Sequence, residues 1–208
     1  MRLTLFLALG LVLTTAPLPA QEKTDGKKVQ PPPTMAEMMP KPGPEATKLK
    51  GMVGTWTVAE TVEASPMGPA GTGRGVSRVS SGPGGLSIII DYRSISGHMK
   101  GYRGHGVVAW DAEAKAYKQV WTDNMAQMIM LSTGNLEGDK LILNYEGTMM
   151  GKPFKSHDTM SGMGTDTLTM VSEMSMDGSP MAKVMTLVQK RVKATDAKPA
   201  EMKEAAKK

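Results

Sequence analysis

The sequence predicts an all-β protein in which about ten antiparallel strands form a single meander barrel, with disordered extensions at both ends. Between residues 52 and 192, apolar and polar residues alternate with a period of two, which is typical of half-buried strands. Turn residues, above all glycine, separate these segments roughly every 8–14 residues, and no helical pattern is long enough to connect parallel strands. Because about ten consecutive strands are many for an open antiparallel sheet, closure into a barrel is favoured.

The first strand is expected at residues 52–63, after a short polar, helix-compatible segment at residues 44–51. Apolar side chains occupy mostly even positions and polar side chains odd positions, namely Met52, Trp56, Val58 and Val62 against Thr55, Thr57, Thr61 and Glu63. This alternation predicts that one face of the strand is buried.

The remaining strands are expected in order at residues 71–80, 86–96, 102–110, 117–123, 128–136, 140–146, 154–160, 166–176 and 181–192. Residues 82–85 (GPGG) and 137–139 (EGD) are the clearest turn signals between them. The glycine-rich residues 71–75 open the second strand without the helix or the Lys-Ser/Thr pair of a phosphate-binding loop. They indicate instead a β-bulge or a close approach of another group to the backbone.

The ends of the chain carry signals of a different kind. Met1-Arg2, an apolar run from Leu3 to Leu13 and a small residue at Ala20 predict a secretory signal peptide (residues 1–20) that is cleaved after Ala20. The apolar run is shorter than the roughly 20 residues that span a bilayer, so we expect an exported protein, periplasmic or extracellular, with no membrane span. Residues 21–44 predict a disordered leader and residues 194–208 a disordered Lys/Ala-rich tail, which leaves residues 45–193 for the barrel.

Composition excludes several classes of site. With no cysteine, the chain has no disulfide framework, thiol nucleophile or thiolate metal site. The net charge of +5 comes largely from the C-terminal end, from Lys190 and Arg191 onward, which predicts a solvated basic tail. Basic side chains are not interleaved with aromatic ones, so nucleic acid is not an expected partner. The 20 methionines against 2 phenylalanines indicate that methionine fills core positions, where its flexibility suits an adaptable cavity.

Four segments resemble known families. Gly54-Thr55-Trp56, after its helix-compatible lead-in, resembles the G-x-W opening of lipocalins and other calycins. Residues 104–111 (GHGVVAWD) and 117–125 (YKQVWTDNM) resemble the central signature of a bacterial family called domain of unknown function 1579, with Trp110 where a tyrosine is usual. Residues 146–154 are similar to a turn of that family. The resemblance, over about residues 46–192, implies a lipocalin-like barrel in an exported protein and implies no activity.

The candidate ligand-binding residues are Trp56, Tyr117, Gln119, Trp121 and Asp123. In a barrel, alternate residues of a strand point inward, so the last four share one face that mixes aromatic and polar groups, as small-molecule pockets do. The alternative is that Trp56 and Trp121 plug the barrel floor and that Asp123 caps a turn.

No cofactor is predicted. Haem would need one iron-ligating histidine in an apolar pocket, but we expect His98, His105 and His157 at turns or on the surface, with His98 and His105 flanking one hairpin. Cu(I) is the other alternative, because Met149, Met150, Met160 and Met163 lie near His157 in what we expect to be loops. Many methionines instead alternate as core residues.

The sequence contains no recognisable catalytic motif. Our hypothesis is that the barrel binds a small, amphipathic ligand. One alternative is a structural or interaction module of the cell envelope whose barrel is filled. The other is a hydrolase or isomerase with a dispersed site, which would bring His105, Asp123 and an arginine such as Arg93 within hydrogen-bonding reach.

Overall fold

The computed structural model describes residues 32–65 and 68–193. The predicted signal peptide, residues 21–31 of the predicted leader and the predicted tail at 194–208 lie outside this range. The chain divides into two units at Met39. The first contains the one-turn helix α1 (Met35–Met38), whose N-cap Thr34 and Glu37 form a capping box. The second unit contains the barrel.

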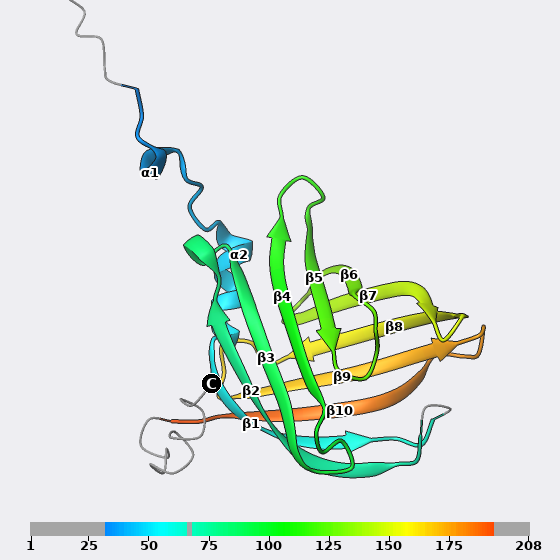
Figure 1. The fold of residues 1–208 in the computed structure, drawn as a ribbon. Helices are drawn as coiled ribbons and strands as arrows, with labels where there is room; N and C mark the ends of the chain where they lie inside the picture. The colour runs from blue at the N-terminus through cyan, green and yellow to red at the C-terminus, as the bar shows by residue number, and fades with distance from the viewer. Residues whose placement is uncertain (1–31, 66–67, 194–208) are drawn as a thin grey trace, which may run out of the picture. The chain divides into compact units, whose positions relative to one another are not determined.

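Ten antiparallel strands form the closed barrel that the sequence predicts, and Figure 1 shows them following one another around it. Each strand pairs with its neighbours in the sequence, and β1 pairs with β10 to close the sheet. The strands are β1 (Gly54–Val62), β2 (Gly71–Ser81), β3 (Ser87–Gly97), β4 (Arg103–Asp111), β5 (Ala116–Asp123), β6 (Met130–Glu137), β7 (Lys140–Met149), β8 (Lys152–Ser161), β9 (Thr167–Met176) and β10 (Ala182–Arg191).

The first strand begins two residues later than expected. Met52 belongs to the 3-10 helix η1 (Lys50–Met52), which continues directly from helix α2 (Pro44–Leu49). Proline suits the first turn of a helix because its missing N–H would have no intrahelical partner there. Alternation alone cannot separate Met52 from the strand, since its side chain is as buried as those of the inward strand residues.

The helices define one end of the barrel, which we call the helix end. Ala46 and Leu49 of α2 are buried, and α2 contacts β3 and β4. Leu49, Met52 and Trp56 are fully covered and belong to the main apolar cluster. The turns β4–β5, β6–β7 and β8–β9, together with the turn helix η2 (Pro83–Gly85), lie at this end because the strands alternate in direction. The opposite end, which carries the β3–β4 and β5–β6 connections, is called the far end.

Arg191 fixes the helix end, which corrects its predicted place in a solvated basic tail. Its guanidinium lies 4.1 Å from the ring centroid of Trp56 and donates to the carbonyl oxygens of Val53 (2.6 Å) and Gly51 (2.9 Å). Gly54 has a φ of 151°, and a Cβ there would lie 2.5 Å from Arg191 Nη1. The Gly54-x-Trp56 motif therefore has a physical reason: glycine leaves room for the cation over the indole ring.

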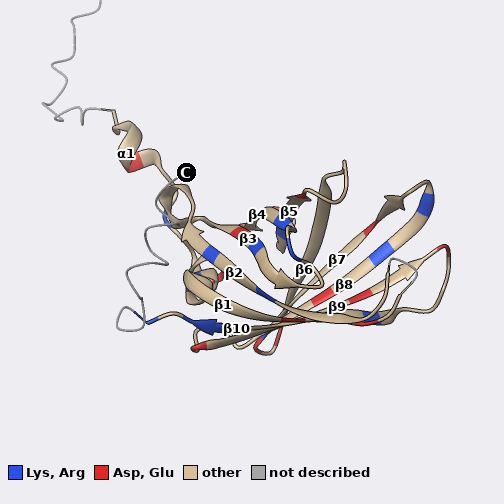
Figure 2. Ribbon diagram, turned by 60° about the horizontal axis from the view of Figure 1, so that its bottom comes forward, with Lys and Arg blue, Asp and Glu red and all other residues tan. Residues whose placement is uncertain are grey.

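The charged residues outside the helix end are spread over several strands, with both signs interspersed (Figure 2). Exposed ion pairs such as Lys155–Glu146 (2.8 Å) and Lys183–Glu63 (3.2 Å) link neighbouring strands. Pairs of this kind contribute little to stability in water. Among the described residues, no helix is both long and apolar enough to cross a membrane.

Candidate functional site

The barrel interior contains a partly enclosed cavity with a volume of about 120 Å³. Its wall is mainly apolar and includes five methionines, Met52, Met99, Met160, Met170 and Met185. The other wall residues are Ser77, Val79, Ile90, Tyr92, Tyr102, Gln119, Trp121, Leu141, Leu143, Asp158, Leu168, Ser172, Leu187 and Gln189. The methionine-rich interior that the composition predicts therefore surrounds this space.

The residues of β5 that are predicted to point inward lie in two places, the cavity wall and the helix end. Gln119 and Trp121 line the cavity. Tyr117 is 1% exposed, donates its hydroxyl to the Glu45 carbonyl (3.1 Å) and packs edge-on against Trp110 at 5.0 Å. Tyr117 therefore ties α2 to the barrel and is not among the wall residues.

Trp56 also lies away from the cavity wall. It is 0% exposed, and its Nε1 donates to the Met52 carbonyl at 3.0 Å. With Arg191 over its ring, Trp56 occupies the floor of the barrel, as the alternative interpretation of this residue expects. Trp121 does not share that floor position, because it lies further along the barrel, on the cavity wall.

The position of Trp121 depends on two glycines of β4. Gly104 pairs with Asp123 and Gly106 pairs with Trp121 in the β4–β5 register. A Cβ at Gly104 would lie 2.1 Å from Trp121 Cζ2, and one at Gly106 would lie 2.6 Å from its Cε3. The indole ring therefore covers the space that two side chains would otherwise fill, which explains the Gly-x-Gly of this strand.

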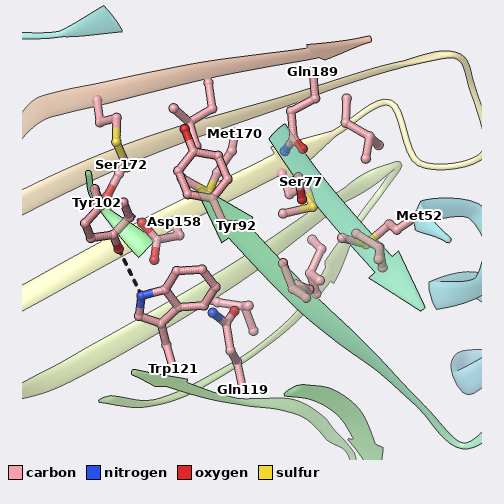
Figure 3. A pocket seen from close by; sticks show the side chains of 18 of the residues that line it. Met52, Ser77, Tyr92, Tyr102, Gln119, Trp121, Asp158, Met170, Ser172 and Gln189 are labelled. Atoms are coloured by element: carbon pink, nitrogen blue, oxygen red, sulfur yellow. Dashed lines mark hydrogen bonds between the residues drawn. The ribbon is translucent and has the colours of Figure 1, made fainter. Parts of the chain in front are cut away.

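Trp121, Tyr102 and Asp123 form a hydrogen-bonded chain near the far end. The Trp121 Nε1 donates to the Tyr102 hydroxyl at 3.2 Å, drawn as the dashed line in Figure 3, and that hydroxyl donates to Asp123 Oδ2 at 3.2 Å. Asp123 Oδ1 accepts from the backbone N–H groups of Met125 (2.8 Å) and Ala126 (3.0 Å), so Asp123 also caps a turn. Burial, and then the negative charge of Asp123, raise the pKa of Tyr102, which therefore stays a neutral donor.

Asp158 is the wall residue that sequence reasoning missed. It lies inside β8, where it faces Ser172 of β9, and Ser172 Oγ donates to Asp158 Oδ1 at 2.6 Å. His157 and Met160 lie within this strand, as the strand expected at residues 154–160 places them, and not in the loop that the Cu(I) alternative assumes. The available signal was the alternation of Phe154, Ser156, Asp158 and Met160 on one face. Burial raises the pKa of Asp158, while the Ser172 hydrogen bond opposes the shift.

A second polar group surrounds the buried carboxylate of Glu60. The Tyr92 hydroxyl donates to Glu60 Oε1, and Ser94 Oγ donates to Oε2 at 2.9 Å. A Cβ at Gly73 or Gly75 would collide with this carboxylate, at 2.3 and 2.8 Å respectively. The β2–β3 register also shifts at Gly75, so the glycine-rich start of β2 provides both the close approach and the bulge that were predicted. Burial, and then Glu60, raise the pKa of Tyr92.

The dispersed catalytic cluster does not form. His105 points away from the interior and pairs with Asp91 at 2.8 Å, whereas Asp123 is held by Tyr102 on the opposite face of the sheet. Arg93 pairs across strands with Arg103. His98 lies against Gly71 beyond the end of β3, and His157 contacts Asn144 at 2.8 Å. Over residues 32–65 and 68–193, no three His, Asp or Glu side chains converge as metal ligands.

One solved structure shares the fold, and a second shows a more remote likeness. Rv2717c from M. tuberculosis is similar with a TM-score of 0.52 and 14% identity, over 74% of this chain and 100% of that chain. The S-type phycobiliprotein lyase CPES from Guillardia theta is similar with a TM-score of 0.47 and 10% identity, over 74% of this chain and 99% of that chain. The first likeness shows the barrel fold alone, and the second is too remote to support an inference.

No curated protein matches the sequence. The model of the family described as "Protein of unknown function (DUF1579)" matches residues 41–191. This range agrees with the resemblance carried by the Gly-x-Trp opening and the β4–β5 signature, and it spans the whole barrel. The chain therefore belongs to the DUF1579 family, whose model covers the whole barrel.

Proposed function

We propose that this protein binds a small, amphipathic molecule inside its barrel. The observation that supports the proposal is the partly enclosed cavity of about 120 Å³, whose wall combines flexible methionines with a few polar groups. Apolar walls with a small number of placed polar groups are the usual composition of ligand pockets. A cavity of roughly 150 Å³ accommodates a benzene-sized molecule, so the ligand, or the part of it that enters the barrel, is of that size.

The cavity favours binding over the filled-barrel alternative, which predicts no internal space. Apolar packing at the helix end already provides a core, with Trp56, Leu49 and Met52 fully covered. The polar wall residues Gln119, Gln189 and Ser77 each place hydrogen-bonding groups beside the cavity. No described side-chain polar atom is both enclosed and unsatisfied, so these groups are reached from the cavity, where a polar ligand atom can bond to them.

The test uses methyl NMR of the methionines, with benzyl alcohol as a neutral probe of matching size. We expect the methyl signals of Met170 and Met185, which line the cavity, to shift on titration. Met150, at 89% exposure, is the internal control and should not shift. Saturable shifts confined to the wall methionines would support binding, and equal response of all methionines, or none, would refute it.

The predicted signal peptide extends this proposal to location: the protein acts outside the cytoplasm, after cleavage following Ala20. The sequence signal is the basic start, apolar run and small residue within residues 1–20. Mass spectrometry of the chain purified from its own cell envelope should give a mature N-terminus at Gln21. An N-terminus at Met1 on the purified protein would contradict export by this route.

A further inference from the structure

Asp158 presents one carboxylate oxygen to the cavity. Its Oδ1 accepts from Ser172 Oγ at 2.6 Å, whereas Oδ2 accepts no hydrogen bond from any described residue. No buried side-chain oxygen or nitrogen in that part of the chain is both enclosed and unsatisfied. Oδ2 is therefore accessible, and because Asp158 belongs to the wall, that access is through the cavity. Oδ2 therefore has no hydrogen-bond donor within the described residues, and a ligand can supply one.

Three aromatic rings lie on the same part of the wall. Figure 3 shows Tyr102, Trp121 and Asp158 close together, with Tyr92 above them. The rings of Tyr92 and Tyr102 are 5.9 Å apart and tilted by 54°, and Trp121 is fixed to Tyr102 by its hydrogen bond. Aromatic faces attract cations through their quadrupole, and several such faces around one position are a common way to bind an ammonium group.

The charges around the cavity have one sign. Asp158 is the sole charged side chain among the wall residues, and none of them is Lys, Arg or His. Arg191, which faces the interior at the helix end, is already bound to backbone carbonyls over Trp56. The wall therefore provides no counter-ion for a carboxylate or phosphate, and Asp158 would repel either. A metal ion would need several convergent ligands, which the described residues do not provide.

We propose that the cavity binds a small organic cation, whose ammonium group lies against Asp158 among the rings of Tyr92, Tyr102 and Trp121. This inference rests on the proposed function and adds the chemical class of the ligand. The apolar part of the cation packs against Met170 and Met185, which adapt to its shape. The ammonium N–H groups, or the methyl groups of a quaternary ammonium, contact Asp158 Oδ2 and the aromatic faces.

Three probes that differ in charge and share one ring test this assignment by isothermal titration calorimetry at neutral pH. They are benzylamine, benzyl alcohol and benzoate. We expect benzylamine to bind roughly tenfold or more tightly than benzyl alcohol, because hydrogen bonds to an ionised partner are the stronger ones. Benzoate should bind most weakly. Binding of benzyl alcohol equal to or tighter than that of benzylamine overturns the cation assignment and leaves the ligand cavity in place. Failure of all three probes to bind contradicts both proposals.

The charge-removing variant is Asp158→Asn, which keeps the size of the side chain and an oxygen for Ser172 Oγ. It should lose the preference for benzylamine, with about a tenfold or greater loss of benzylamine affinity and little change for benzyl alcohol. The matched control is Asp91→Asn, which removes the same charge from an outward-facing carboxylate that is 61% exposed and pairs with His105. Equal benzylamine affinity in Asp158→Asn and the wild type, or equal losses in both variants, would overturn the role of Asp158.

Discussion

The two ends of the barrel interior differ in what their buried groups do. At the helix end, Trp56, Tyr117 and Arg191 all bond to backbone carbonyls of the segment that covers the barrel. Around the cavity, Trp121 bonds to Tyr102 and Tyr102 bonds to Asp123, while Asp158 keeps one oxygen free. The first arrangement holds the fold together, and the second leaves capacity for a ligand. Substitutions at matched positions should separate these two roles.

The largest effect is expected for Trp56→Ala at the helix end. Its side chain is 0% exposed and makes both a hydrogen bond and a contact with the Arg191 guanidinium. Removal of a fully buried tryptophan costs about 3–5 kcal/mol of unfolding free energy. Urea denaturation followed by far-UV circular dichroism measures this loss. A loss below about 1 kcal/mol would show that the floor is not a principal source of stability.

Arg191→Met tests how much the charged guanidinium contributes to stability at the helix end. The methionine keeps apolar length over Trp56 and removes the donors to Val53 and Gly51, which lie at 2.6 and 2.9 Å. We expect a loss of about 2–3 kcal/mol, since hydrogen bonds from a charged donor are the stronger ones and the carbonyls are left unpaired. Lys152→Met is the control, because it removes a charge from an exposed ion pair with Asp177 (3.0 Å) and shares no partner with Arg191. It should cost less than about 0.5 kcal/mol.

At the cavity, Trp121→Ala should lower the unfolding free energy less than Trp56→Ala does, and it should impair ligand binding. The ring is half-buried and borders the cavity, so its removal enlarges a space that already exists. We expect a loss of about 2 kcal/mol of unfolding free energy and the loss of measurable benzylamine binding. Titration calorimetry on the folded variant, verified by near-UV circular dichroism, provides the measurement. Unchanged affinity would remove Trp121 from the site.

The contrast between Trp56 and Trp121 also shows what the sequence can and cannot predict. A period of two assigns both residues to the inward face, and the structure places both there. It does not say how far along the barrel each one lies, because that depends on the register between strands and on which end the helix covers. Alternation therefore predicts which side chains face inward, and it cannot distinguish residues of the floor from residues of the cavity wall.

Long-range neighbours are the other part that the sequence does not provide. Arg191 meets Trp56 only because β1 pairs with β10. Asp158 lies near Tyr102 only because the sheet curls around the cavity, since β5 to β7 separate β8 from β4 along the sheet. The glycine pairs are the exception. Gly104 and Gly106 face inward at alternate positions opposite Trp121, so a hairpin register between β4 and β5 is enough to predict that the indole covers them.

The smallest effect on stability, and the one of opposite sign, is expected for Asp158→Asn. Burial raises the pKa of Asp158 in the folded protein above its value in the unfolded chain. The protonated carboxyl is therefore favoured by folding, and this contribution is complete at low pH and is lost as pH rises through the folded-state pKa. Asparagine does not ionise, so Asp158→Asn should be slightly more stable than the wild type at neutral pH, with the difference shrinking on acidification.

The same protonation governs ligand affinity. Below the pKa of Asp158 in the ligand-free protein, a cation must displace a proton, so benzylamine affinity should fall by about tenfold per pH unit. The titratable groups around Asp158 are Tyr102 and Tyr92, whose raised pKa values keep both neutral, and His157 beside it on β8. Asp123 lies beyond Tyr102, and Glu60 lies beyond Tyr92. His157→Gln is the control. His157 faces outward to Asn144 and its charge lowers the pKa of Asp158, so this variant should keep the pH profile and shift its midpoint only toward higher pH. Loss of the pH profile in His157→Gln, or its persistence in Asp158→Asn, would show that a group other than Asp158 titrates, and would contradict the charge that we place inside the barrel.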